Sequence, residues 1–153
     1  MRAIECFDYV NDLRERFFPT YRGLTSDQLD WRPEGSKNNI GFLLRHVAQS
    51  EDWFVRVVIF GENVIPKRKA ELQSIDLILD YLHETRERTI AFLESNSMED
   101  LREVRAIPEG FRAEPIENPT IRWIMHRLFD HEAYHLGQVN MLMRLQGIDP
   151  PKM

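Results

Sequence analysis

The segment 131–135 reads His-Glu-Ala-Tyr-His, with two histidines four residues apart and a glutamate directly after the first. On an α-helix, side chains four residues apart lie on one face, so His131 and His135 can bind a single metal ion. Zinc proteases use this spacing, and in them the glutamate activates a metal-bound water. The residue types and their spacing therefore indicate metal chemistry at this segment.

A zinc protease of this kind also needs a third protein ligand, and the rest of the chain supplies none. After His135 the sequence has no further histidine or glutamate, and Asp149 is its only acidic residue. Gln138 and Met141 stand where the longer protease motif has glycine and histidine. We therefore reject the protease interpretation, keep the metal-site hypothesis, and expect the third ligand from upstream.

Polar groups interrupt the stripe of this segment that is expected to face the core. The stripe reads Ile124, Leu128, His131, His135, Gln138, Leu142 and Leu145. A single buried histidine is usually satisfied by a hydrogen bond, but two imidazoles and an amide in one apolar seam need a common partner. We favour a shared metal ion, and a hydrogen-bonded polar layer is the alternative.

His46 is the upstream histidine that best fits a third metal ligand. It lies in an apolar segment, 40–47, that is expected to be helical. Standing alone, such a residue would be read as a hydrogen-bonded core histidine, so its assignment as a ligand depends on the downstream pair. His83 and His126 lie among charged residues, and we expect both at the surface, outside the metal site.

Glu132 follows His131 and precedes His135 by three residues, at the edge of the expected metal-binding face. It could act as a general base or as an acceptor that orients a metal ligand. The alternative is an ordinary solvated charge on a helix. Only the segment 132–135 has the Glu-x-x-His spacing, whereas a dinuclear carboxylate site needs two such motifs, so we expect a single metal.

Length and composition limit the possible classes of protein. The 153 residues, with 42% hydrophobic and 29% charged residues, are typical of one globular domain, here 1–153. The net charge of −5 argues against binding to nucleic-acid phosphates. No apolar run is long enough to span a membrane, and the N-terminus lacks the apolar centre of a signal peptide. The lone Cys6 fits a reducing cytoplasm, and we expect it to be a small buried apolar residue.

Helical periodicity appears in four segments, at about 3–21, 39–60, 74–94 and from 119 or 120 to 146. Pro19 should kink or end the first, and Gly61 and Gly147 should end the second and fourth. No segment reads as a convincing strand. The sequence therefore predicts an all-α fold, a four-helix bundle.

The connections between these segments carry further signals. The residues 25–29 have the spacing of a capping box and predict a short helical turn, and 97–101 resemble them. The connection 103–118 is longer than a bundle usually needs, and such loops tend to be functional. We expect it near the mouth of the metal site. Trp53, Trp123 and Tyr134 could form walls of a pocket there, although aromatic residues at helical spacing are more often plain core.

Four segments, at 29–33, 39–51, 120–138 and 147–151, follow a known pattern. They resemble the DinB/YfiT-like superfamily, whose members include metal-dependent enzymes. The resemblance is carried by 39–51, which contains His46, and by 120–138, which contains His-x-x-x-His-x-Gly-Gln. It extends to Leu-Asp-Trp-Arg-Pro at 29–33 and to Gly-Ile-Asp-Pro-Pro at 147–151. The resemblance implies a four-helix bundle that binds one divalent metal ion, most often zinc or nickel, through His46, His131 and His135.

The same resemblance favours one reaction and leaves others open. Members of the superfamily include transferases that use low-molecular-weight thiols, a thiol-dependent isomerase and hydrolase-like proteins. Three neutral imidazoles leave a divalent ion with an open position, which can ionise a thiol or a water. We therefore expect a metal-dependent thiol S-transferase. The alternatives are a hydrolase of small amides or esters and a non-catalytic metal-binding bundle. The resemblance and the many large apolar residues also suggest a homodimer.

Overall fold

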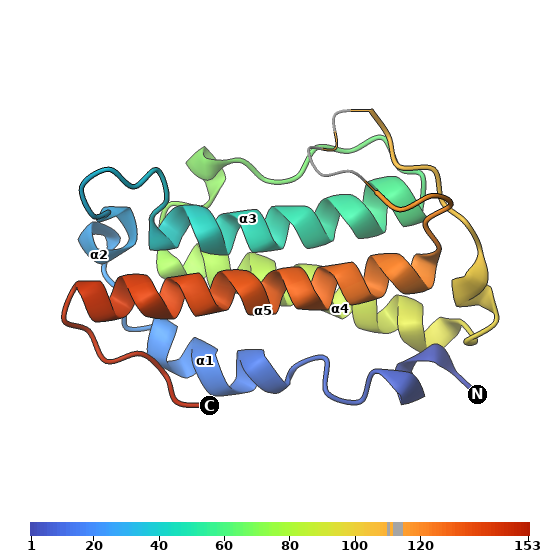
Figure 1. Cartoon of the computed structure of the whole chain (residues 1–153), viewed down its shortest axis with the longest axis horizontal. Helices are drawn as coiled ribbons and strands as arrows, with labels where there is room; N and C mark the ends of the chain where they lie inside the picture. Colours follow the sequence, from blue (N-terminus) through green and yellow to red (C-terminus); the bar gives the residue numbers. More distant parts are fainter. Residues whose placement is uncertain (110, 112–114) are drawn as a thin grey trace.

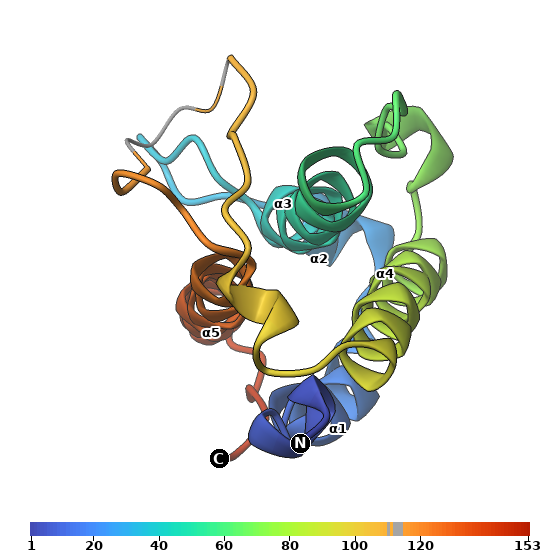
Figure 2. The same cartoon turned by 90° about the vertical axis from the view of Figure 1, so that its right-hand side faces the viewer.

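The protein is a bundle of four helices around a shared core, seen in a computed structural model that describes residues 1–109, 111 and 115–153. The helices are α1 (Asp12–Tyr21), α3 (Ile40–Asp52), α4 (Ile75–Ser95) and α5 (Ile121–Leu145). A π-helical segment, η2 (Trp53–Ile59), continues α3. Along the bundle, α3 and α5 lie side by side and run in opposite directions (Figure 1), and in the end view α1 and α4 complete the bundle (Figure 2). The prediction of an all-α four-helix bundle is confirmed.

Each long helix except α1 begins where a side chain caps it. Asn39, Ser74 and Thr120 each accept a hydrogen bond from the backbone N–H three residues further on, which satisfies a group that the first turn would leave unpaired. The short helix α2 (Ser26–Asp30) starts with the capping box that the sequence predicted, formed by Thr25 and Gln28. These caps set the bounds of the helices that carry the three histidines.

The first helix is shorter than predicted. A 3₁₀ turn, η1 (Ala3–Cys6), precedes α1, which begins only at Asp12 and ends two residues after Pro19. The backbone N–H of Ala3 donates to the carbonyl of Asn96 at 2.8 Å, so the N-terminus is fixed to the end of α4. Residues 8–11, between η1 and α1, form turns, so one straight helix from residue 3 is not present. The expectation for Cys6 is also wrong, because its thiol is exposed and lies 3.4 Å from the sulfur of Met1.

The connections lie around the two ends of the bundle and along one side of it. Between η2 and α4 the chain forms a 3₁₀ turn, η3 (Lys69–Glu71), and after α4 another, η4 (Asp100–Arg102), replaces the helical turn expected there. In the long connection 103–118, Phe111 stacks on Trp53, with 6.0 Å between ring centroids. Residues 110 and 112–114 of this connection lie outside the described residues.

The described residues contain no β-strand, only the isolated bridges Arg2–Ser97 and Val104–Thr120. Buried apolar side chains form two clusters. One joins α1, α2, α3 and α4 to the C-terminal half of α5, and the other joins η1 and η2 to the N-terminal half of α5. Over the part of the chain that the structure describes, no helix is long and apolar enough to cross a membrane.

Candidate metal centre

The three histidines predicted as ligands meet between α3 and α5. The Nε2 atom of His131 lies 3.0 Å from Nε2 of His46 and 3.0 Å from Nε2 of His135. All three side chains are half-buried. Metal ions are usually bound by groups of histidine, cysteine or acidic side chains. Among the described residues, these three histidines form such a group, and their possible ligand atoms all lie within 4.8 Å of one another. A residue from α3 is therefore brought to a pair from α5 that is 85 positions away in the sequence.

The distances between the three nitrogens fit a shared metal ion. With metal–nitrogen bonds of about 2.0–2.1 Å, ligands of a tetrahedral ion are about 3.3 Å apart, and adjacent ligands of an octahedral ion about 2.9 Å. The observed separations of 3.0 Å lie within this range. Three imidazole nitrogens are also a donor set that suits zinc and nickel. The residues present therefore fit a divalent transition-metal ion.

Gln138 fixes the tautomer of one ligand. Its Oε1 atom accepts a hydrogen bond from Nδ1 of His135 at 2.6 Å, so the proton lies on Nδ1 and the lone pair on Nε2 points toward the other two histidines. The amide of Gln138 also donates to the hydroxyl of Tyr134 at 3.4 Å. The sequence placed Gln138 in the same seam, but its action on His135 depends on side-chain orientation and was not predicted.

The environment favours the neutral form of His131 and His135. Burial, followed by the neighbouring His135, His46 and Arg127, lowers the pKa of His131 to about 3. Burial also lowers the pKa of His135, against the opposing effect of Gln138. Only the neutral form of imidazole has a lone pair for a metal, so the site is prepared for binding at neutral pH.

Two exposed aromatic side chains contact the histidines. Phe42 is 48% exposed and stacks parallel to His46, with ring centroids 5.8 Å apart. Tyr134 is 65% exposed and meets His135 edge-on at 5.1 Å. Trp53 and Trp123, expected as pocket walls, are half-buried. Apolar rings that reach the surface therefore lie next to two of the three half-buried histidines.

Glu132 has a place that the sequence did not predict. It is neither a solvated surface charge nor part of the histidine cluster, because its side chain is only 5% exposed and its two carboxylate oxygens bind arginines. Nε of Arg14 donates to one oxygen at 2.5 Å, and Nη2 of Arg86 donates to the other. Burial and these two ion pairs favour a structural role for Glu132, and its role as a general base stays an untested prediction.

Four buried charges form a closed ring at the centre of the bundle. Besides Glu132, Arg14 and Arg86 both bind Glu51 of α3, through Nη2 at 2.6 Å and Nε at 2.8 Å, and Thr89 donates to the same carboxylate. We call Arg14, Glu51, Arg86 and Glu132 the arginine–glutamate ring. Burial alone would raise the pKa of Glu51, but the two arginines outweigh it and lower that pKa to about 2. The ring ties α3 to α5 away from the histidines.

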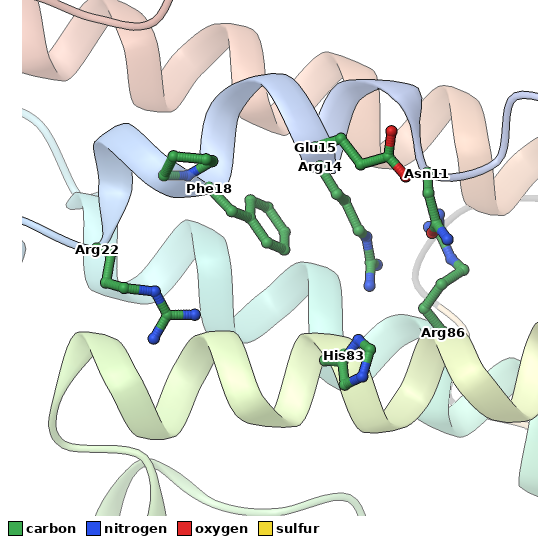
Figure 3. Close-up of a pocket in the computed structure, with 8 residues that line it drawn as sticks. Asn11, Arg14, Glu15, Phe18, Arg22, His83 and Arg86 are labelled. Atoms are coloured by element: carbon green, nitrogen blue, oxygen red, sulfur yellow. The ribbon is translucent and has the colours of Figure 1, made fainter.

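The sequence contains a signal for this ring that was not among the predictions. Arg14 lies three residues before the buried Phe17, and Arg86 lies four residues after the buried Leu82, so both interrupt apolar stripes. Both arginines also line a pocket of about 530 Å³ between α1 and α4, where they extend from opposite helices (Figure 3). The histidine ligands do not line this pocket.

The remaining histidines lie where the sequence placed them. His83 is exposed and forms an ion pair with Glu87 at 3.2 Å. His126 is also exposed and contacts the ring of Phe7, with 5.9 Å between centroids. Neither belongs to the histidine cluster.

Comparison of the sequence with known proteins identifies the family of this chain. The profile of the DinB superfamily matches residues 10–139, which include all three clustered histidines, and the chain therefore belongs to the DinB superfamily. It is also similar to the uncharacterized protein YizA of Bacillus subtilis (strain 168), with 25% identity over 144 residues. That match covers 94% of this chain and 87% of YizA.

Proposed function

We propose that His46, His131 and His135 bind one divalent metal ion, zinc or nickel, at a catalytic centre. The observation that carries this proposal is the convergence of three Nε2 atoms, with that of His131 3.0 Å from each of the other two and the lone pair of His135 directed by Gln138. A hydrogen-bonded polar layer explains these short contacts less well. Each contact joins two Nε2 atoms, and three neutral imidazoles have too few protons on these atoms to make every contact a hydrogen bond.

The proposed reaction is S-transfer from a low-molecular-weight thiol to an electrophile. A divalent ion on three neutral ligands keeps its full charge and an open position, and there it lowers the pKa of a thiol. In the overall reaction the thiol proton goes to solvent, a sulfur–carbon bond forms, and the leaving group departs with its bonding electron pair. Two ring contacts support this proposal, because Phe42 and Tyr134 offer apolar surface to an electrophile beside His46 and His135.

Hydrolysis of small amides or esters is less well supported. A metal-dependent hydrolase usually needs a carboxylate that takes a proton from the attacking water. Glu132 was the residue suited to that task, and both of its carboxylate oxygens are bound to arginines. S-transfer does not require such a base, because a thiol gives up its proton far more readily than water.

Metal content tests the first half of the proposal. The purified protein should contain about one divalent ion per chain, and His46→Ala, His131→Ala and His135→Ala should each lower the content and the affinity. His83→Ala is the matched control, because His83 is exposed and lies outside the cluster. Full metal retention by all three ligand variants would contradict the proposed site.

Turnover tests the second half. The metal-loaded protein is mixed with a panel of low-molecular-weight thiols and a chromogenic electrophile, and product is followed with and without thiol. Thiol-dependent product that is absent in His135→Ala supports S-transfer, whereas turnover without thiol indicates hydrolysis. If no thiol or ester reacts and metal removal only lowers the melting temperature, the protein is a metal-binding bundle without catalysis.

A further inference from the structure

Arg127 lies on α5 one helical turn before His131, on the same stripe of the helix as both histidine ligands. Four residues of an α-helix rise about 6 Å, and side chains at this spacing lie one above the other. Within α5, Arg127, His131 and His135 are spaced four residues apart. Helix register therefore places Arg127 on the face of α5 that carries the two histidine ligands.

The charge of Arg127 has no counter-ion among residues 1–109, 111 and 115–153. None of the ion pairs and hydrogen bonds of these residues involves its side chain, although Arg127 is half-buried. Arg14 and Arg86, in contrast, each bind two carboxylates. A half-buried cation next to a divalent ion raises the local positive charge, and an anion bound there would relieve it.

Aromatic residues lie further along α3 and α5 in the direction of Arg127. Because α3 and α5 are antiparallel (Figure 1), the direction from His131 toward Arg127 on α5 corresponds to the direction from His46 toward Trp53 on α3. Trp123 lies one further turn along α5, and Phe111 stacks on Trp53. Apolar walls reduce the access of water, and an ion pair with a guanidinium is stronger where water is excluded.

We infer that Arg127 is a specificity-determining residue that binds a carboxylate of a molecule reacting at the metal centre. A guanidinium binds a carboxylate through two parallel hydrogen bonds, and this geometry also fixes the direction of the bound molecule. This inference rests on the proposed function, and the carboxylate can belong either to the thiol or to the electrophile.

A matched pair of thiols tests the first source. 3-Mercaptopropionate and 3-mercapto-1-propanol have the same length and differ in the carboxylate. Each is titrated into Co²⁺-loaded protein, and the thiolate-to-cobalt absorption band gives its affinity. We expect the carboxylate thiol to bind about tenfold more tightly than the alcohol, as for one charge-assisted hydrogen-bonded pair. In Arg127→Gln the two affinities should become equal, and the cobalt content should stay at one per chain.

A second arm tests the electrophile as the source. The protein is first saturated with 3-mercapto-1-propanol, and the binding of butyrate is compared with that of butyramide. A preference for butyrate that is lost in Arg127→Gln assigns the carboxylate to the electrophile. Arg122→Gln is the control in both arms, because Arg122 is exposed on the same helix and should change neither preference.

The outcomes separate this inference from the proposed function. A preference that depends on Arg127 in either arm supports the inference. If cobalt and thiols bind but no preference for a carboxylate is found, or if Arg127→Gln keeps the preference, the inference is wrong while the metal centre stands. If the wild-type protein binds no metal, the proposed function fails, and the inference fails with it.

Discussion

Glu132→Gln is the change that most directly tests whether Glu132 stabilises the bundle through its ion pairs with Arg14 and Arg86. The wild-type carboxylate accepts from Arg14 at 2.5 Å and from Arg86, and its side chain is 5% exposed. Glutamine has the same shape but one acceptor oxygen instead of two. Its amide group would point N–H donors at a guanidinium that itself can only donate.

The expected loss of stability follows from the charges of the ring. Two arginines and two glutamates are neutral together, and the substitution leaves one positive charge without a partner in the interior. Removing one partner from a buried ion pair costs about 3–5 kcal/mol, out of a total stability of about 5–15 kcal/mol. For a domain of this size, such a loss lowers the melting temperature by about 6–20 °C.

Urea and thermal unfolding of the metal-free protein measure the effect, and Glu87→Gln is the matched control. Glu87 is 66% exposed and pairs with His83, so the same substitution there should cost less than about 1 kcal/mol. Metal content and turnover of Glu132→Gln are measured at a temperature where the variant is folded, and we expect both to equal those of the wild-type protein.

Two results would refute this reasoning. If Glu132→Gln lowers the free energy of unfolding by less than about 1 kcal/mol, the charges of the arginine–glutamate ring are not buried from solvent. Unchanged stability together with lost turnover would return Glu132 to the general-base role that its sequence position suggested.

Three further predictions follow from the same structure. The pKa of Glu51 in the folded protein, about 2, lies below its ordinary value of 4.5. The contribution of Glu51 to the free energy of unfolding should therefore be complete above pH 4.5 and be lost as the pH drops toward 2. Urea unfolding measures this change, and a constant free energy of unfolding over this range would contradict the prediction. Gln138→Leu should weaken metal binding about 10–100-fold in a chelator competition, whereas Tyr134→Phe should keep the wild-type affinity; equal affinities in all three proteins would remove Gln138 from the site. The protein should form a homodimer in light scattering, and Met141→Glu, in the exposed apolar stripe of α5 with Tyr134 and Leu145, should dissociate it; a wild-type monomer at micromolar concentration would refute this.

The bounds of three helices were determined by local sequence. The predicted segments 39–60, 74–94 and 120–146 correspond to α3 with η2, α4 and α5. Apolar periodicity, capping side chains and the glycines at 61 and 147, both with positive φ, act over only a few residues, so they can be read from the sequence. The prediction for 3–21 was wrong in its first half, where η1 and the turns at 8–11 precede α1; apolar periodicity did not reveal these turns, nor the anchoring of Ala3 to Asn96, 93 positions away.

The histidine cluster was also largely present in the sequence, because polar side chains in an apolar seam indicate a shared partner. Its position is decided by helix packing, which brings His46 to His131 across 85 residues. The sequence predicted which residues could bind a metal, whereas the 3.0 Å separations and the contact of His135 with Gln138 come from the tertiary structure.

The role of Glu132 was decided by tertiary structure alone. Periodicity placed this residue at the edge of a buried face, where a charged side chain can meet either solvent or a counter-charge. Its partners are Arg14, 118 residues away, and Arg86, 46 residues away, and no local signal connects them. A buried charge is stable only when an opposite charge reaches it, so the packing of α1 and α4 against α5 determined that Glu132 stabilises the bundle.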